Sequence, residues 1–157
     1  MTPGSGGPVL LCDDGSVPAR RAIAAAGELF GGGPALVVTV WEPYKPGLFQ
    51  AVGGTVALAS GLAKDFDEAA LEMATAGATA GVEAAAAAGF DAKPLVVRGR
   101  PREAIVEAAR EHGARAVVVG NRGQGSVESV LYGSVSMGVL HESPVPVLVV
   151  RGPEADD

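Results

Sequence analysis

Short apolar runs that alternate with helix-forming stretches are the feature that most constrains this fold. Such runs occur at residues 9–12, 35–41, 93–97, 116–119 and 145–150, and they are apolar almost throughout rather than at alternate positions. Continuous apolar character is typical of strands buried on both faces, and strand–helix alternation is typical of a parallel sheet. We therefore predict an α/β fold: an open, Rossmann-like parallel sheet of five strands with helices on both faces.

The segments between these runs predict four helices and one long loop. The first helix covers residues 19–30, with Ser16 as N-cap and Pro18 in its first turn. The others cover 61–88, 101–112 and 134–141, and Gly89 and Gly113 close two of them. Residues 43–60 contain several Gly and Pro without a period, so we predict a loop that serves function or movement.

Length, charge and cysteine content exclude several classes of protein. The 157 residues suit one domain, which we place at 8–151, with residues 1–7 and 152–157 as flexible ends. Neither a membrane span nor a signal peptide is predicted, and a single cysteine fits a reducing compartment, so we expect a cytoplasmic protein. The net charge of −6 makes nucleic acid a poor default partner, and two histidines with one cysteine make a metal site unexpected.

A glycine-rich segment at residues 120–136 follows the fourth predicted strand and leads into the last helix. In open α/β sheets, ligands bind at the carboxyl ends of strands. Glycines 120, 123 and 133 would allow positive φ and close backbone approach, and exposed amides at a helix start attract phosphate. The alternative is an ordinary glycine-rich surface loop, since the chain contains 23 glycines.

The spacing of these glycines resembles a known nucleotide-binding signature. Gly120 is followed after two residues by Gly123, and after nine more by Gly133 and Ser134. This pattern, with Val-Leu-Leu-Cys-Asp-Asp-Gly-Ser at the front, resembles the ATP-binding branch of the universal stress protein family. The resemblance extends over residues 8–151 and implies a strand order of 3-2-1-4-5.

The resemblance also implies a set of ATP contacts. Asp14, the backbone near Cys12 and Val40 would meet the adenosine, while Val119 and Gly120 would lie by the adenine and ribose. The phosphates, with Mg²⁺ bridging them, would be held mainly through amides and hydroxyls. The residues assigned to this end are Arg122, Gly123, Gly133, Ser134, Val135 and Ser136.

Some charged and aromatic residues keep two interpretations. Arg98, Arg100 and Arg122 either add positive potential near the phosphates or are solvated loop charges. Arg100 stands where the family often has an acidic residue. Trp41 packs either beside the ligand or in a core or interface.

The candidates for chemistry favour binding over catalysis. Asp14 could act as a general base but is better explained as a hydrogen-bond acceptor or helix cap, and Asp13 faces solvent or supports the turn. Cys12 is interpreted as an inert small hydrophobe rather than a redox thiol. His112 and His141 suit helix ends. We assign no catalytic residue, since the chain has no P-loop, dinucleotide or nucleophile-elbow signature.

These observations predict a nucleotide-dependent stress-response regulator. The alternatives are a slow ATPase, a protein that binds AMP or cyclic AMP (cAMP), and an interaction protein that uses no nucleotide. The strand from Val145 to Val150 is strongly apolar although it is expected at a sheet edge. An exposed apolar edge promotes association, and the family commonly dimerises in this way, so we expect a homodimer through this strand.

Overall fold

The computed structural model describes residues 6–45, 56–121 and 133–152. Within them lies one parallel sheet of five strands in the order β3-β2-β1-β4-β5, which confirms the predicted fold class and strand order. The strands are β1 (Val9–Cys12), β2 (Gly33–Trp41), β3 (Phe90–Arg98), β4 (Ala116–Gly120) and β5 (Val147–Val150).

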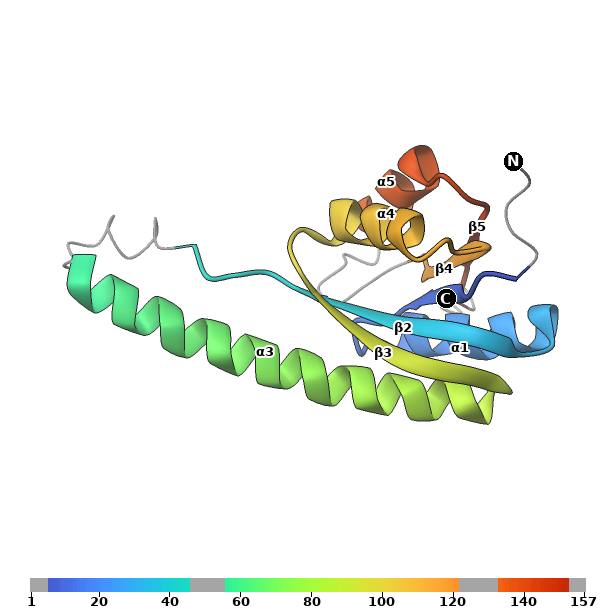
Figure 1. The fold of residues 1–157 in the computed structure, drawn as a ribbon, viewed down its shortest axis with the longest axis horizontal. Helices are drawn as coiled ribbons and strands as arrows, with labels where there is room; N and C mark the ends of the chain where they lie inside the picture. The colour runs from blue at the N-terminus through green and yellow to red at the C-terminus, as the bar shows by residue number, and fades with distance from the viewer. Residues whose placement is uncertain (1–5, 46–55, 122–132, 153–157) are drawn as a thin grey trace, which may run out of the picture.

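The helices cover both faces of the sheet, as predicted. They are α1 (Val17–Phe30), α3 (Val56–Ala87), α4 (Pro101–Glu111) and α5 (Ser134–Glu142). Figure 1 shows α1 and α3 on one side of the sheet and α4 and α5 on the other. Among the described residues, no helix combines the length and the apolarity needed to cross a bilayer.

Alternate residues of the central strands supply the two layers of the core. Val9 and Leu11 of β1 pack with α1 and α3, whereas Leu10 of β1 packs with α4 and α5. All three side chains are fully buried. Burial on both faces accounts for the continuous apolar runs in the sequence.

The first helix begins as its sequence predicts. Ser16 is the N-cap of α1 and accepts a hydrogen bond from the Ala19 amide at 3.2 Å, and Pro18 lies in the first turn. Gly31 ends the helix in the left-handed conformation with φ of 71°. A residue with a Cβ rarely adopts this conformation, so glycine suits this position.

The predicted loop at 43–60 is wrong in its last part, because α3 begins at Val56. Gly61 is an interior residue of the helix rather than its first. One interior glycine costs only about 1 kcal/mol relative to alanine, and the Val-Ala-Leu-Ala-Ser segment before it supports a helix. Residues 46–55 of the predicted loop lie outside the described residues, as do the termini 1–5 and 153–157.

The edge strands also differ from the prediction in length. Strand β3 is longer than residues 93–97 and pairs with β2 from Phe90 to Arg98. Pro94 lies inside it, which an edge strand tolerates because one side needs no hydrogen bonds. Strand β5 begins at Val147 rather than Val145, although the Pro146 carbonyl already accepts a hydrogen bond from the Val117 amide at 2.9 Å.

Candidate functional site

A pocket of about 270 Å³ opens at the carboxyl ends of β1, β2 and β4, close to the lower end of the range for small-molecule sites. Strand β1 pairs with β2 on one side and with β4 on the other, and the winding of the sheet reverses between β1 and β4. The lining residues are Cys12, Asp13, Asp14, Ala19, Val38, Val40, Pro101, Ile105, Val119, Gly120, Gly133, Ser134, Val135 and Ser136.

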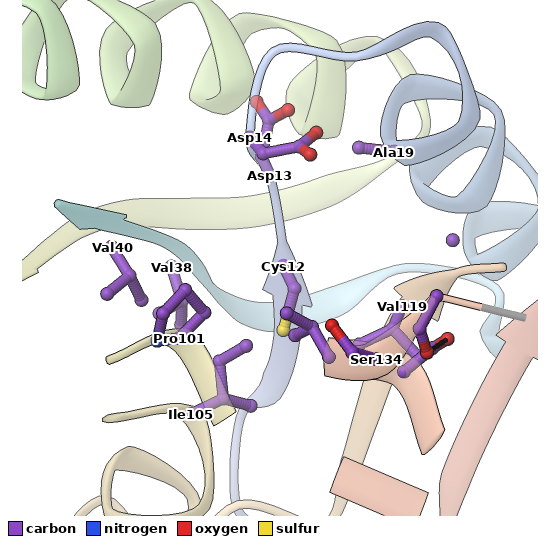
Figure 2. A pocket seen from close by; sticks show the side chains of 14 residues that line it. Cys12, Asp13, Asp14, Ala19, Val38, Val40, Pro101, Ile105, Val119 and Ser134 are labelled. Carbon is purple, nitrogen blue, oxygen red and sulfur yellow. Dashed lines mark hydrogen bonds between the residues drawn. The ribbon is translucent and has the colours of Figure 1, made fainter. Parts of the chain in front are cut away.

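One side of the pocket is apolar. It is formed by Val38 and Val40 of β2 with Pro101 and Ile105 of α4, and we call it the apolar side. In Figure 2 these four side chains lie together beside the end of β1. The two valines are two residues apart on one face of a strand, and Pro101 and Ile105 are four apart on one face of a helix. A flat, weakly polar group would lose little by leaving water here.

The opposite side is formed by the start of α5, and we call it the amide side: Gly133, Ser134, Val135 and Ser136. The Met137 amide donates to the Gly133 carbonyl at 3.1 Å, and this is the first hydrogen bond of the helix. The amides of Ser134, Val135 and Ser136 come before it and have no intrahelical acceptor. Gly133 is the N-cap and makes no side-chain cap hydrogen bond, so the helix start is suited to an anion.

Neither of the described glycines 120 and 133 has a positive φ. Gly133 has φ of −69°, and Gly120 is not among the residues with positive φ, so the expected left-handed conformations are wrong for both. A Cβ at Gly120 would lie 3.0 Å from the carbonyl carbon and oxygen of Pro18. Glycine at 120 therefore lets the first turn of α1 approach the end of β4.

The hydroxyl of Ser136 is already engaged within the protein. It is buried and donates to the Gly133 carbonyl at 2.9 Å. The Gly133 amide in turn donates to the Asn121 carbonyl at 2.7 Å. These bonds fix Gly133 at the start of α5, so Ser136 offers a ligand its amide rather than its hydroxyl hydrogen.

Cys12 lies between the two sides of the pocket, as Figure 2 shows. Burial, followed by the charges of Asp13 and Asp14, raises the pKa of its thiol from 9.0 to about 12. At neutral pH the sulfur is therefore a protonated thiol with little nucleophilic character. This supports the interpretation of Cys12 as an inert hydrophobe.

The two carboxylates after β1 have different surroundings. Asp14 lines the pocket, is exposed, and accepts a hydrogen bond from the Ser16 amide at 2.9 Å. Asp13 is buried, with 3% of its surface exposed, and accepts from the Gly15 amide at 2.9 Å. Asp13 thus supports the turn, and the alternative that it faces solvent is wrong.

Comparison with known proteins identifies the fold. The model of the universal stress protein family matches residues 7–151. The chain belongs to this family. A universal stress protein of Thermus aquaticus is 37% identical over 145 residues, which cover 91% of this chain and 97% of the relative.

Solved structures of universal stress proteins share the architecture. The Methanocaldococcus jannaschii protein MJ0577 superimposes with a TM-score of 0.72 at 21% identity, over 97% of this chain and 100% of that one. A universal stress protein solved in complex with cAMP has a TM-score of 0.56 at 27% identity, over 92% and 95% of the two chains.

In this universal stress protein, the structure brings together all the predicted site residues that it describes. They surround one pocket from three strand ends and one helix start. Arg122 and Gly123 lie outside the described residues. Sequence reasoning missed Asp13, Ala19, Val38, Pro101 and Ile105 as lining residues. The two-residue spacing of Val38 and Val40 indicates that Val38 lies on the same face of β2 as Val40. No feature of the sequence indicates the orientation of α4, which carries Pro101 and Ile105.

Two of the arginines that the sequence offers as possible phosphate contacts lie outside the pocket. Arg98 and Arg100 line a second groove between β3 and α4, not the pocket. The Arg98 guanidinium lies over the Trp41 ring, 5.7 Å from its centroid, so Trp41 is occupied by a cation–π contact.

The two histidines lie at helix ends, as expected: His112 caps the end of α4 and His141 lies in the last turn of α5. Among the described residues, no cluster of metal-ligating side chains occurs.

Proposed function

We propose that this universal stress protein is a nucleotide-dependent stress-response regulator that binds ATP, with Mg²⁺, in the pocket between β1, β2 and β4. One observation carries the proposal: an apolar side suited to a base and an amide side suited to phosphate face each other across one pocket. This is the distribution of polarity that a nucleotide has along its own length.

The residues present fit this ligand. The adenine would lie against Val38, Val40 and Ile105, and Asp14 at the rim would accept a hydrogen bond from the adenosine. The phosphates would lie against the amides of α5, whose positive dipole end favours anions. Mg²⁺ would be held by phosphate oxygens and its own waters, as is common for this ion.

Another adenine nucleotide is the second candidate. A relative of 27% identity has been solved with cAMP, which has the same base and a single phosphate. The apolar side would bind the base of both ligands with the same affinity. The preference between ATP and cAMP therefore depends on how many phosphate oxygens accept hydrogen bonds from the amide side.

Thermal unfolding with ATP, AMP, cAMP and adenosine, each at the same concentration, tests the proposal. A ligand at 100 times its Kd stabilises the folded state by about 2.7 kcal/mol. We expect the largest stabilisation with ATP and Mg²⁺, a smaller one with AMP and cAMP, and the smallest with adenosine. A larger shift with cAMP would favour the second candidate, and no shift with any adenine ligand would contradict both.

A regulator and a slow ATPase differ in product formation. Phosphate positioning alone accelerates hydrolysis to some degree. We expect purified protein to retain ATP over hours and native mass spectrometry to find the nucleotide intact. ADP formation that disappears when the pocket is blocked by Val40→Phe would establish the ATPase instead.

We also propose that two copies pair through β5. This strand is the outer neighbour of β4. The opposite edge, β3, contains Lys93 and Pro94, residues that discourage edge pairing. The Pro146 carbonyl accepts from Val117 of β4, and the Val150 carbonyl accepts from Asn121, the residue after β4. The alternate residues Val147 and Val149 therefore direct their backbone groups to the free edge.

Val149→Pro tests the dimer with little disturbance of the sheet. Proline removes one outward amide and leaves the bonds to β4 in place. We expect light scattering to give a dimer for the wild type and a monomer for Val149→Pro, with similar circular dichroism. A wild-type monomer at micromolar concentration would contradict the proposal.

A further inference from the structure

Asp13 lies at the end of β1 and its side chain is on the α3 side of the sheet. It follows Val9 and Leu11 in the alternation of β1, and both of these pack against α1 and α3. Its carboxylate is 1% exposed. A buried carboxylate is costly unless it is paired, so the groups around Asp13 show what it does.

Arg20 of α1 supplies the opposite charge. Its Nη2 lies 3.0 Å from Asp13 Oδ2, and its Nε donates to Asp13 Oδ1 at 3.2 Å. The same guanidinium donates through Nη1 to the Ala80 carbonyl of α3 at 3.1 Å. One arginine therefore connects the residue that follows β1 to the C-terminal third of α3.

Gly81 of α3 brings the helix against the carboxylate itself. A Cβ at this position would lie 2.4 Å from Asp13 Oδ2 and 2.7 Å from Val37 Cγ1. A Cβ at Gly77, one turn earlier, would meet nothing within 4 Å. The two glycines have the same helix propensity but only Gly81 is in contact, so α3 sits directly on Asp13 at this point.

The other end of the Asp13 carboxylate holds the turn that carries Asp14. Oδ1 accepts from the Gly15 amide at 2.9 Å, and Gly15 has φ of 79°. Asp14, between them, lines the pocket. The position of Asp14 thus depends on the same carboxylate that contacts α3.

We propose that Asp13 and Arg20 are positioning residues that hold turn 13–16 in its ligand-binding shape and couple it to the seating of α3. We call this set, with Ala80 and Gly81, the Asp13 clamp. Its effect on affinity rests on the proposed nucleotide function. Coupling between two sites is reciprocal, so nucleotide that fixes the turn also fixes α3.

Gly81→Ala, with Gly77→Ala as matched control, tests the clamp. Each variant adds one methyl group to α3 and raises its helix propensity equally. We expect Gly81→Ala to raise the Kd for ATP by about tenfold, within the usual range of coupling between sites, and Gly77→Ala to leave it unchanged. ATP should slow amide exchange near Ala80 in the wild type but less so in Gly81→Ala.

The clamp also has a test that needs no nucleotide. In the free protein, Gly81→Ala should speed hydrogen exchange of the Gly15 amide, and Gly77→Ala should not. Unchanged Gly15 exchange in Gly81→Ala overturns the clamp whatever the binding data show. Faster Gly15 exchange in a protein whose wild type binds no adenine ligand supports the clamp and rejects the proposed function.

Arg20→Gln gives an independent variant should Gly81→Ala not fold. It removes the charge and the contact with Ala80, while its neighbour Arg21 offers the control Arg21→Gln. We expect faster Gly15 exchange and weaker ATP binding only in Arg20→Gln. Equal behaviour of the two variants would mean that Arg20 contributes net charge alone, and would overturn its positioning role.

Discussion

The two sides of the pocket are built from different parts of the chain. The apolar side is made of side chains, those of Val38, Val40, Pro101 and Ile105, whereas the amide side offers the backbone at the start of α5. A side-chain surface changes with almost any substitution. A backbone surface keeps its donors through all substitutions except proline, so the two sides can be altered separately.

Blocking the apolar side should have the largest effect. Val40→Phe places a ring where the adenine would lie, so we expect binding of ATP, AMP and adenosine to fall below detection in calorimetry. Loss of ATP binding alone would show that the base does not lie on this side.

Val97→Phe is the matched control for Val40→Phe. Val97 is the cross-strand partner of Val40 in the β2–β3 register, but it lines the second groove. Both variants add the same volume to the same face of the sheet. Comparable unfolding temperatures with binding lost only in Val40→Phe would separate occlusion from destabilisation.

This contrast also explains which parts of the site could be predicted from sequence. Gly120, Gly133 and Ser134 are found because the carboxyl ends of parallel strands meet at one edge and glycine marks close backbone approach. Pro101 and Ile105 are missed because only the packing of α4 on the sheet turns them toward the pocket. That packing depends on long-range contacts, which local sequence does not specify.

The buried position of Asp13 is one that the sequence alone can predict. Alternation along β1 places residue 13 on the same buried face as Val9 and Leu11. A carboxylate there requires a partner, and Arg20, seven residues later on α1, provides it. The predicted start of α3 is wrong because Gly61 is interpreted as a helix boundary. The helix begins before this glycine and continues through it.

Removing one donor from the amide side should have an intermediate effect that depends on phosphate. Ser134 is the first residue of α5, where proline fits, and Gly133 has φ −69° and ψ 156°, the extended conformation favoured before proline. Ser134→Pro therefore deletes an amide and keeps the helix. We expect the Kd for ATP to rise by about 10- to 150-fold, since a hydrogen bond to a charged group contributes about 1.5–3 kcal/mol.

Adenosine and Ser134→Ala are the controls for this variant. Adenosine has no phosphate, so calorimetry should give it the same Kd with wild type and Ser134→Pro. Ser134→Ala removes the hydroxyl and retains the amide, so its loss of ATP affinity should be smaller. An equal loss in both variants would assign the phosphate contact to the hydroxyl rather than to the backbone.

The smallest expected effect concerns Cys12, which lies where the two sides of the pocket meet. This effect is seen only at alkaline pH. The folded thiol has its pKa raised to about 12, against 9.0 in a free chain. Between these pH values the unfolded chain loses the proton while the folded protein keeps it. The stability contributed by the thiol of this half-buried residue is therefore fully present below pH 9 and is lost as pH rises toward 12. Denaturant unfolding of wild type and Cys12→Ser should give stability curves that run parallel up to pH 9 and then diverge, with the wild type falling faster. Curves that stay parallel to pH 12 would show that the thiol ionises equally in both states, and that water reaches the floor of the pocket on the side where an apolar base is expected to lie.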